Sequence, residues 1–473
     1  MNNLTIKSAL EMLRNKQISS FELTRFCLEN IKTNDKELNS FITLNEEEAL
    51  KKAKESDDLY SAKQNAPLQG IPIALKDLYL TKGLRTTAGS LVLEDYVPQY
   101  DATVVKKLKD AGAVIVGKTN LDAWAHGSSG ENSQFGPTKN PYDEKFVPGG
   151  SSSGSAVSVA SEFALGSTGT DTGGSIRLPA SFTNTVGLKP TYGRVSRYGI
   201  VAMASSLDSI GHFTKTVGDS ALLLNITAGR DLNDATTPPV AVPDYTKDLG
   251  QTSIEGSLKG LKIGIPKEYL GEGLDSKVRK AFDDSLKVLR KLGAEIIDIS
   301  LPYTDYAIAC YYILQPAEVS SNLARYDGIR YGFDRSNFGD EAKRRIMLGT
   351  FTLSVGYYDA YYKKAMKVRT MIKKDFDQAF EKVDAIVAPV SPTPPWKLGE
   401  KANDPLSMYL SDAYTVTVNI AGVPGLSVPA GFIGDLPTGI QFIGPNFSEE
   451  LLFRIGANFE QETMFWERRP KLT

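Results

Sequence analysis

Residues Gly149–Thr191 read GGSSSGSAVSVASEFALGSTGTDTGGSIRLPASFTNTVGLKPT. The segment is rich in glycine and serine, yet apolar residues from Ala156 to Phe163 recur through it at helical spacing. Two glycine turns, Gly149–Gly154 and Asp171–Ser175, flank this apolar run. A flexible linker would not carry such a stripe, so we predict a buried helix between two tight turns.

A buried strand is expected upstream of this segment, in the sequence PLQGIPIALKDLYL. The apolar residues of Ile71–Leu75 alternate there, and the run ends on the charged pair Lys76 and Asp77. A strand of this kind would carry Lys76 into the interior, where an ammonium group loses its hydration. Lys76 is therefore a candidate for unusual chemistry.

Helices and strands alternate along the rest of the chain. Thr103–Gly117 predicts a helix, a turn at Gly112 and a strand. Further predicted elements are an α/β unit at 260–300, a long helix at Tyr357–Phe380, a strand at Asp384–Val390 and a hairpin arm at Leu436–Gly444. This alternation predicts an α/β fold with a mixed, mostly parallel β-sheet core covered by helices on both faces.

The same pattern suggests how the chain is divided. We expect residues 1–66 to form an N-terminal helical segment packed on the core, because apolar residues there recur at steps of three and four. Residues 67–473 would form one α/β domain, in which 303–380 is a helical insertion.

Bulk composition excludes several classes of protein. The 473 residues include 54 basic and 56 acidic side chains, so no net field attracts nucleic acid or anionic lipid. No apolar window is long enough to span a bilayer, and the first residues lack the apolar core of a signal peptide. With Cys27 and Cys310 as the only cysteines, and no metal-ligand spacing, we expect a reduced cytoplasmic protein without a metal or other cofactor.

Histidine is scarce, and this limits the possible mechanisms. Gly150–Gly154 matches the G-x-S-x-G elbow of α/β-hydrolases, but that mechanism needs a histidine late in the chain. Only His126 and His212 occur, and neither is late. Neither glycine turn ends in the Gly-Lys-Ser/Thr of a phosphate-binding loop, so a nucleotide site on this chain is disfavoured as well.

Lysine is the remaining common base for a serine nucleophile. Burial would favour the neutral amine of Lys76, but composition alone favours a simple ion pair with Asp77 or another carboxylate. In the turn Thr172–Ser175, small residues let backbone N–H groups converge, as an oxyanion site requires. The glycines alone favour a tight turn without chemistry, so neither residue set establishes a catalytic site by itself.

The ordered set of motifs decides between them. The GGSS turn, the DTGGSIR-P turn and the GLKPT exit of Gly149–Thr191 closely resemble the amidase signature family. That resemblance implies a Ser–Ser–Lys triad, in which Ser175 is the nucleophile, Ser151 follows a cis peptide and relays the proton, and Lys76 is the base. It also implies an oxyanion hole built from the N–H groups of Thr172, Gly173, Gly174 and Ser175, braced by Asp171 and Arg177.

Further blocks are similar to one branch of that family, the A-type chains of glutamyl-tRNA(Gln) amidotransferases. They are Lys118–Pro141, Glu318–Gly332, Lys343–Phe351 and Val418–Gly431. This similarity implies a glutaminase that passes ammonia to a partner subunit, which holds ATP and Mg²⁺ and converts Glu-tRNA(Gln) to Gln-tRNA(Gln). The implied partners are two further subunits of the B and C types and, through the complex, misacylated tRNA.

The same resemblance implies a binding site for free glutamine. Arg345 would meet the α-carboxylate as a bidentate partner, and Asp412 would meet the α-ammonium group. Tyr311 and Ser128 would complete the site, although the adjacent Tyr312 makes the assignment of Tyr311 less secure. Each residue has an alternative role in an ion pair or in the core.

The chain departs from the family pattern at a few places. Ser153 stands where glycine is usual, and the segment between Gly332 and Lys343 is shorter than expected. Ala123, Trp124 and His126 replace the commoner EFAMG pattern, and for His126 a role in the wall or core is favoured over contact with substrate.

Two rival functions remain. One is a free-standing amidase acting on small or aryl amides, and the other is a scaffold without activity. A pocket for apolar amides would not favour the charged pair Arg345 and Asp412, and the intact triad argues against a scaffold.

Overall fold

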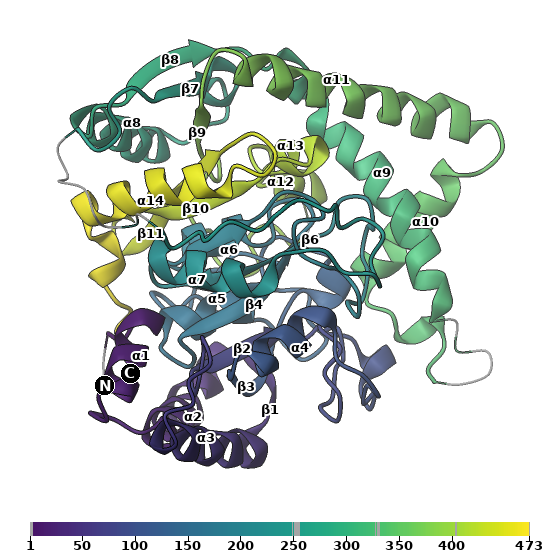
Figure 1. The fold of residues 1–473 in the computed structure, drawn as a ribbon. Coiled ribbons are helices and arrows are strands. Elements are labelled where there is room, and N and C mark those ends of the chain that lie inside the picture. The colour runs from purple at the N-terminus through teal and green to yellow at the C-terminus, as the bar shows by residue number, and fades with distance from the viewer. Residues whose placement is uncertain are drawn as a thin grey trace.

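The computed structural model describes residues 3–247, 249, 256–326, 328, 332–402 and 404–472. Its centre is one eleven-stranded sheet, with strand order β1-β3-β2-β4-β6-β5-β10-β11-β9-β7-β8 (Figure 1). The strands are β1 (Phe41–Leu44), β2 (Pro72–Lys76), β3 (Val114–Thr119), β4 (Gly166–Asp171), β5 (Val186–Lys189), β6 (Ser209–Thr214), β7 (Lys262–Pro266), β8 (Glu295–Ile299), β9 (Ala385–Pro389), β10 (Gly425–Ile433) and β11 (Leu436–Ile443).

Helices cover both faces of this sheet (Figure 1). They are α1 (Ile6–Arg14), α2 (Ser20–Leu38), α3 (Glu46–Ser61), α4 (Thr103–Asp110), α5 (Ser153–Ala160), α6 (Arg177–Phe182), α7 (Val217–Thr227), α8 (Ser276–Lys291), α9 (Ala307–Asn322), α10 (Asp340–Thr352), α11 (Lys363–Phe380), α12 (Pro405–Leu410), α13 (Val416–Ala421) and α14 (Glu449–Thr463). The predicted α/β class with a mixed, helix-covered sheet is confirmed.

More of the strand pairs are antiparallel than the sequence suggested. Within the described ranges, β2 pairs in parallel with β3 and β4, and β7 pairs in parallel with β8 and β9. The strands between these groups are antiparallel, because β10 and β11 form a hairpin and β5 and β6 are joined without a covering helix. Parallel pairs occur where a helix crosses over between strands.

Side chains alternate along β2, so successive residues point into two different hydrophobic cores on opposite faces of the sheet. Ile73 and Leu75 point into a large core shared with α1, α4, α7, α8 and α14. Ala74 points to the opposite face, where it packs with Val157 of α5. Since side chains alternate along a strand, Lys76 follows Ala74 onto the α5 face, next to the glycine turn that precedes α5.

The N-terminal segment contributes more than helices. Its residues Phe41–Leu44 form β1, which pairs antiparallel with β3 at the edge of the sheet. The last described residues lie beside this segment (Figure 1), where Arg469 contacts Asn3 and Glu162. The expected helical segment therefore also extends the sheet by one strand.

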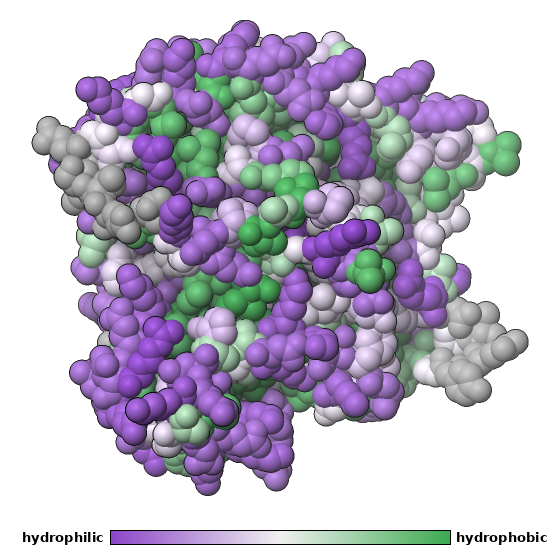
Figure 2. Space-filling view, in the orientation of Figure 1, coloured by the Kyte–Doolittle hydropathy of each residue, from purple (hydrophilic) through white to green (hydrophobic). Residues whose placement is uncertain are grey.

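The helices α9, α10 and α11 lie together at one side of the molecule (Figure 1). A π-helical turn, Tyr358–Tyr362, leads directly into α11, so the predicted helix Tyr357–Phe380 is present with a change of pitch near its start. The face seen in Figure 2 is largely hydrophilic, with apolar side chains gathered in smaller areas. In the described part of the chain, no helix is both long enough and apolar enough to cross a membrane.

Candidate active site

Lys76 ends β2 and is fully buried on the α5 face. Its Nζ lies within hydrogen-bond distance of Ser151 Oγ (2.9 Å), Ser152 Oγ (2.8 Å) and Thr170 Oγ1 (2.7 Å), so a neutral amine can donate to two of these hydroxyl groups and accept from the third. All three partners are hydroxyl groups, which carry no negative charge that would stabilise an ammonium ion. Lys76 is thus held beside Ser151 in a setting that favours the neutral amine.

Burial lowers the pKa of Lys76 to about 7, against the opposing influence of the carboxylates of Asp122, Asp171 and Asp208. The alternative ion pair with Asp77 is contradicted. Asp77 lies 3.1 Å from the Nζ of Lys118 on the neighbouring strand β3, and both side chains are fully buried. Lys118 therefore pairs with the carboxylate of Asp77, which would favour the charged form of Lys76 if it contacted Lys76 instead.

Ser151 lies in the turn before α5, and the Gly150–Ser151 peptide bond is cis, as the resemblance implied. Asp122 packs against this turn: a Cβ at Gly150 would come within 2.1 Å of Asp122 Oδ2. The same carboxylate accepts hydrogen bonds from the backbone N–H groups of Gly130 and Asn132. Only glycine fits at position 150, because Asp122 fills the space of a side chain.

Ser175 lies in the second glycine turn, and 8% of it is exposed. The backbone N–H of Ser152 donates to Ser175 O at 3.3 Å, which joins the two turns. Within the described residues Ser175 Oγ has no hydrogen-bond partner, so the hydroxyl is unengaged. The two turns and β2 thus bring Ser175, Ser151 and Lys76 into one buried cluster.

One of the four predicted oxyanion donors has an acceptor in this structure. Gly174 N–H donates to Asp171 Oδ1 at 2.9 Å. The carboxylate of Asp171 reaches this N–H because the chain turns back on itself at Gly174, where φ is +137°. The backbone N–H groups of Thr172, Gly173 and Ser175 have no acceptor among the described residues and remain available.

Two side chains pack directly against this loop. A Cβ at Gly173 would come within 2.9 Å of the hydroxyl oxygen of Tyr311. A Cβ at Gly174 would come within 2.2 Å of Thr415 Oγ1, which donates to Gly173 O at 2.7 Å. Both glycines are therefore required for close approach, and Tyr311 lies at the wall of the loop.

Asp171 and Arg177 hold the loop from behind, as expected. Arg177 Nη2 lies 3.0 Å from Asp171 Oδ1, and both side chains are fully buried. Burial alone would raise the pKa of Asp171, but the charge and hydrogen bonds of Arg177 lower it to about 2. Arg177 also donates to Gln441, Asn419 and Thr415 O, so the pair is saturated with hydrogen bonds.

Two of the predicted binding residues, Ser128 and Asp412, contact each other. Ser128 Oγ donates to Asp412 Oδ2 at 2.7 Å, and Tyr312 Oη donates to the same oxygen at 3.4 Å. Burial raises the pKa of Asp412 to about 7, although the hydrogen bond from Ser128 and the charge of Arg345 act against it. The two adjacent tyrosines therefore differ: Tyr311 faces the loop and Tyr312 contacts Asp412.

Arg345 is buried, and it forms an ion pair as its alternative role required, although not at the surface. Its Nε lies 2.8 Å from Glu341 Oε1, and its Nη1 donates to Gln315 Oε1 at 3.0 Å. Its guanidinium carbon lies 5.3 Å from the ring centre of Tyr312 and 5.9 Å from that of Tyr409. His126 is also buried, and burial followed by the positive charge of Arg345 lowers its pKa well below the usual value.

Several residues of this site were not predicted. Ser152 and Thr170 share the contacts of Lys76 Nζ, and both lie within a motif, so their proximity to Lys76 was the only missing information. Thr415, Asn419 and Gln441 come from the last quarter of the chain. Asn419 donates to Asp171 O and Oδ1, at 2.9 Å each. Asn419 lies within the block Val418–Gly431. That block marked the segment as part of the resemblance, but nothing in the sequence indicated that Asn419 would contact Asp171.

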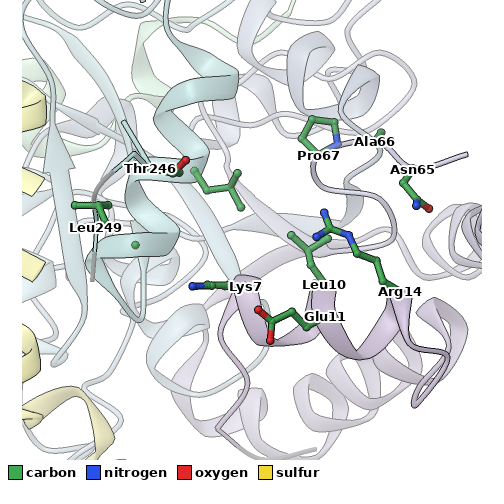
Figure 3. A pocket seen from close by; sticks show the side chains of 11 residues that line it. Lys7, Leu10, Glu11, Arg14, Asn65, Ala66, Pro67, Thr246 and Leu249 are labelled. Carbon is green, nitrogen blue, oxygen red and sulfur yellow. The ribbon is translucent and has the colours of Figure 1, made fainter. Parts of the chain in front are cut away.

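A separate hollow of about 660 Å³ lies between α1 and α7 (Figure 3). It is lined by Lys7, Leu10, Glu11, Arg14, Asn65, Ala66, Pro67, Gly218, Leu222, Thr246 and Leu249. None of the predicted site residues lines it. Across the described residues, no group of three or more His, Cys, Asp or Glu side chains is arranged to hold a metal ion.

The network around Arg177 yields a stability prediction. Arg177→Met should lower the free energy of unfolding by about 3–5 kcal/mol, because it leaves the buried carboxylate of Asp171 without its counter-charge. Arg279→Met is the matched control, since Arg279 forms an exposed pair with Asp283 on α8 and its loss should cost less than about 1 kcal/mol. Thermal or denaturant unfolding measures both, and equal losses would contradict the structural role of Arg177.

Comparison with known proteins identifies the family of this chain. The Amidase family model matches residues 22–453. The chain is 53% identical to the A-type chain of the glutamyl-tRNA(Gln) amidotransferase of Carboxydothermus hydrogenoformans, over 99% of both chains.

Solved structures give the same result. The crystal structure of the corresponding A-type chain of glutamyl-tRNA(Gln) amidotransferase from Thermotoga maritima is 42% identical, with a TM-score of 0.83 over 100% of this chain and 98% of that one. The peptide amidase of Stenotrophomonas maltophilia is 31% identical, with a TM-score of 0.83 over 100% of this chain and 99% of the other. The chain therefore belongs to the amidase signature family of enzymes, and it is similar over its whole length to the A-type chains of amidotransferases.

Proposed function

We propose that this chain is the glutaminase subunit of a tRNA-dependent amidotransferase. The observation that carries the proposal is the contact between Lys76 Nζ and Ser151 Oγ, in a buried site that lowers the pKa of Lys76 to about 7. A lysine with this pKa has a large neutral fraction at physiological pH and serves as a base. The similarity to the A-type chains of amidotransferases supports the choice of substrate.

Ser175 Oγ attacks the side-chain carbonyl carbon of glutamine. Its proton passes to Ser151, and the proton of Ser151 passes to Lys76 Nζ. The carbonyl oxygen becomes an oxyanion, which the N–H groups of Thr172, Gly173 and Ser175 stabilise. As the tetrahedral intermediate collapses, the proton returns to the amide nitrogen, the C–N bond breaks, and ammonia leaves a γ-glutamyl ester on Ser175. Water then cleaves that ester to release glutamate.

The α-substituents of glutamine require two opposite charges. Asp412 binds the α-ammonium group together with Ser128, and Arg345 binds the α-carboxylate. Tyr311 packs against the oxyanion loop at Gly173, and its neighbour Tyr312 contacts Asp412, so this pair of tyrosines joins the loop to the binding residues.

The ammonia is used by another subunit. In this proposal a B-type partner holds ATP and Mg²⁺ and amidates Glu-tRNA(Gln), while a C-type subunit joins the complex in the cytoplasm. This chain has a near-neutral charge, with 54 basic and 56 acidic residues, which fits a complex in which the partner subunit binds the RNA.

The alternative is a free-standing amidase for small or aryl amides. Family members with amidase activity exist, such as the peptide amidase, so the fold does not decide. The buried charges of Arg345 and Asp412 favour glutamine, because desolvating them in front of an apolar amide would be costly.

The nucleophile and the base make the first prediction of this mechanism. Ser175→Ala should abolish ammonia release from glutamine, and Lys76→Ala should lower kcat by at least about a hundredfold, because no other residue replaces the base. Ammonia is measured with purified chain, and circular dichroism checks the fold. Retained glutaminase activity in Ser175→Ala would disprove the mechanism, and a near wild-type rate in Lys76→Ala would point back to a histidine base.

The two groups with pKa values of about 7 predict the pH profile. Lys76 must be neutral and Asp412 must be charged, and both conditions are met only above pH 7. A plot of log(kcat/KM) for glutamine against pH should therefore rise with a slope approaching two at acidic pH and level off above about pH 7. Asp412→Asn should leave a residual activity whose slope is one. Full activity persisting down to about pH 5 would contradict both assignments.

Dependence on partners separates the two functions. Alone, the chain should release ammonia from glutamine slowly, and the B-type and C-type subunits with Glu-tRNA(Gln) and ATP should accelerate this release. The assay compares ammonia release from glutamine and from an aryl amide, with and without the partners. Fast hydrolysis of the aryl amide without any effect of the partners would favour the free amidase.

A further inference from the structure

Two buried polar side chains near Arg345 have no hydrogen-bond partner for some of their donors. Both ring nitrogens of His126 are buried and unpartnered, and so is Nε2 of Gln315. His126 and Gln315 are both fully buried. An unpaired buried polar group costs about 1–3 kcal/mol, so a polar ligand that accepts from these donors would stabilise this part of the site.

The fold places His126 on the Arg345 side of the site. Residues Ala123–Ala125 pack into a core cluster with α9 and α10, which carry Gln315 and Arg345. Trp124 anchors this segment, since its ring centre lies 4.9 Å from that of Tyr326 and 5.3 Å from that of Phe338. Two residues after His126, Ser128 binds Asp412. The backbone at His126 therefore lies between the anchored Trp124 and Ser128, which contacts Asp412.

Gln315 lies one helical turn after Tyr311 on α9. Its Oε1 accepts from Arg345 Nη1, and because a guanidinium group only donates, this contact fixes which end of the amide faces Arg345. The Nε2 group is then an oriented donor without an acceptor among the described residues.

Arg345 alone cannot saturate a carboxylate in this position. Its Nε is engaged by Glu341, and one N–H of Nη1 is engaged by Gln315. A carboxylate offers about four acceptor sites. The guanidinium group therefore leaves room for additional donors, and His126 and Gln315 are the unpartnered donors beside it in the described part of the chain.

We infer that His126 and Gln315 act with Arg345 to bind the α-carboxylate of the substrate, and that His126 is a specificity-determining residue for amides that carry this group. The inference rests on the proposed function and deepens it. A neutral imidazole donates one N–H to a carboxylate oxygen, and burial, followed by the positive charge of Arg345, lowers the pKa of His126 well below its usual value, so the ring is neutral.

The test compares glutamine with 4-aminobutanamide, which has the same chain and ammonium group but no α-carboxylate. His126→Met should raise KM for glutamine at least about tenfold, as expected for loss of a hydrogen bond to a charged group, while kcat changes little. The inhibition constant of 4-aminobutanamide against glutamine hydrolysis should stay within about twofold. His126→Gln, which keeps an N–H donor, should recover most of the affinity for glutamine.

His212→Met is the matched control. His212 is the other buried histidine, its Nε2 is 2.8 Å from Ser220 Oγ, and Ser220 belongs to α7 in the opposite core. This variant should leave both constants unchanged at temperatures where the chain is folded, and melting curves identify that range. All measurements use the full chain, in complex with its partner subunits where these raise activity.

Distinct results overturn the inference and the proposed function. If His126→Met leaves KM for glutamine unchanged, or weakens glutamine and 4-aminobutanamide equally, His126 only fills space and the inference is wrong while the glutaminase stands. If wild-type chain and complex do not hydrolyse glutamine at all, the proposed function is wrong, and the carboxylate site falls with it.

Discussion

The site depends on keeping one buried lysine without a carboxylate in contact. Lys76 Nζ touches three hydroxyl groups, and the acidic residue next to it in sequence, Asp77, is bound by Lys118. Had Asp77 turned towards Lys76, the ammonium form would be stabilised and the base would be lost. The pairing of β2 with β3 therefore has a chemical consequence, because it delivers Lys118 to Asp77.

A second buried basic residue serves the opposite purpose. Arg177 is surrounded by acceptors, and although burial alone would raise the pKa of Asp171, the charge and hydrogen bonds of Arg177 lower it to about 2 beneath the oxyanion loop. The Asp171 carboxylate in turn takes Gly174 N–H and leaves its neighbours in the loop available. The two basic residues therefore have different roles. Hydroxyl partners allow Lys76 to act as a base, whereas carboxylate and carbonyl partners let Arg177 stabilise the oxyanion loop.

Local sequence was sufficient for the elements that position the triad. The alternation of Ile71–Leu75 predicted β2 and the inward direction of Lys76, and the apolar stripe predicted α5 between the two glycine turns. Local sequence was insufficient for contacts between distant segments. Arg177 bonds to Thr415 O and Gln441 across 238 and 264 residues, and no local pattern contains such a pairing. The edge strand β1 and the antiparallel centre of the sheet were missed for the same reason.

The contacts of the charged residues in the predicted glutamine site bear on their alternative roles, which were an ion pair or a place in the core. Asp412 and Arg345 are both buried, yet they are not paired directly with each other, because Ser128 and Tyr312 hold the one and Glu341 and Gln315 hold the other. Arg345 recovers part of its desolvation cost in the ion pair with Glu341, whereas Asp412 has only hydroxyl partners among the described residues. The charge that remains uncompensated in the site is therefore that of Asp412, and a cationic group of a substrate would complement it.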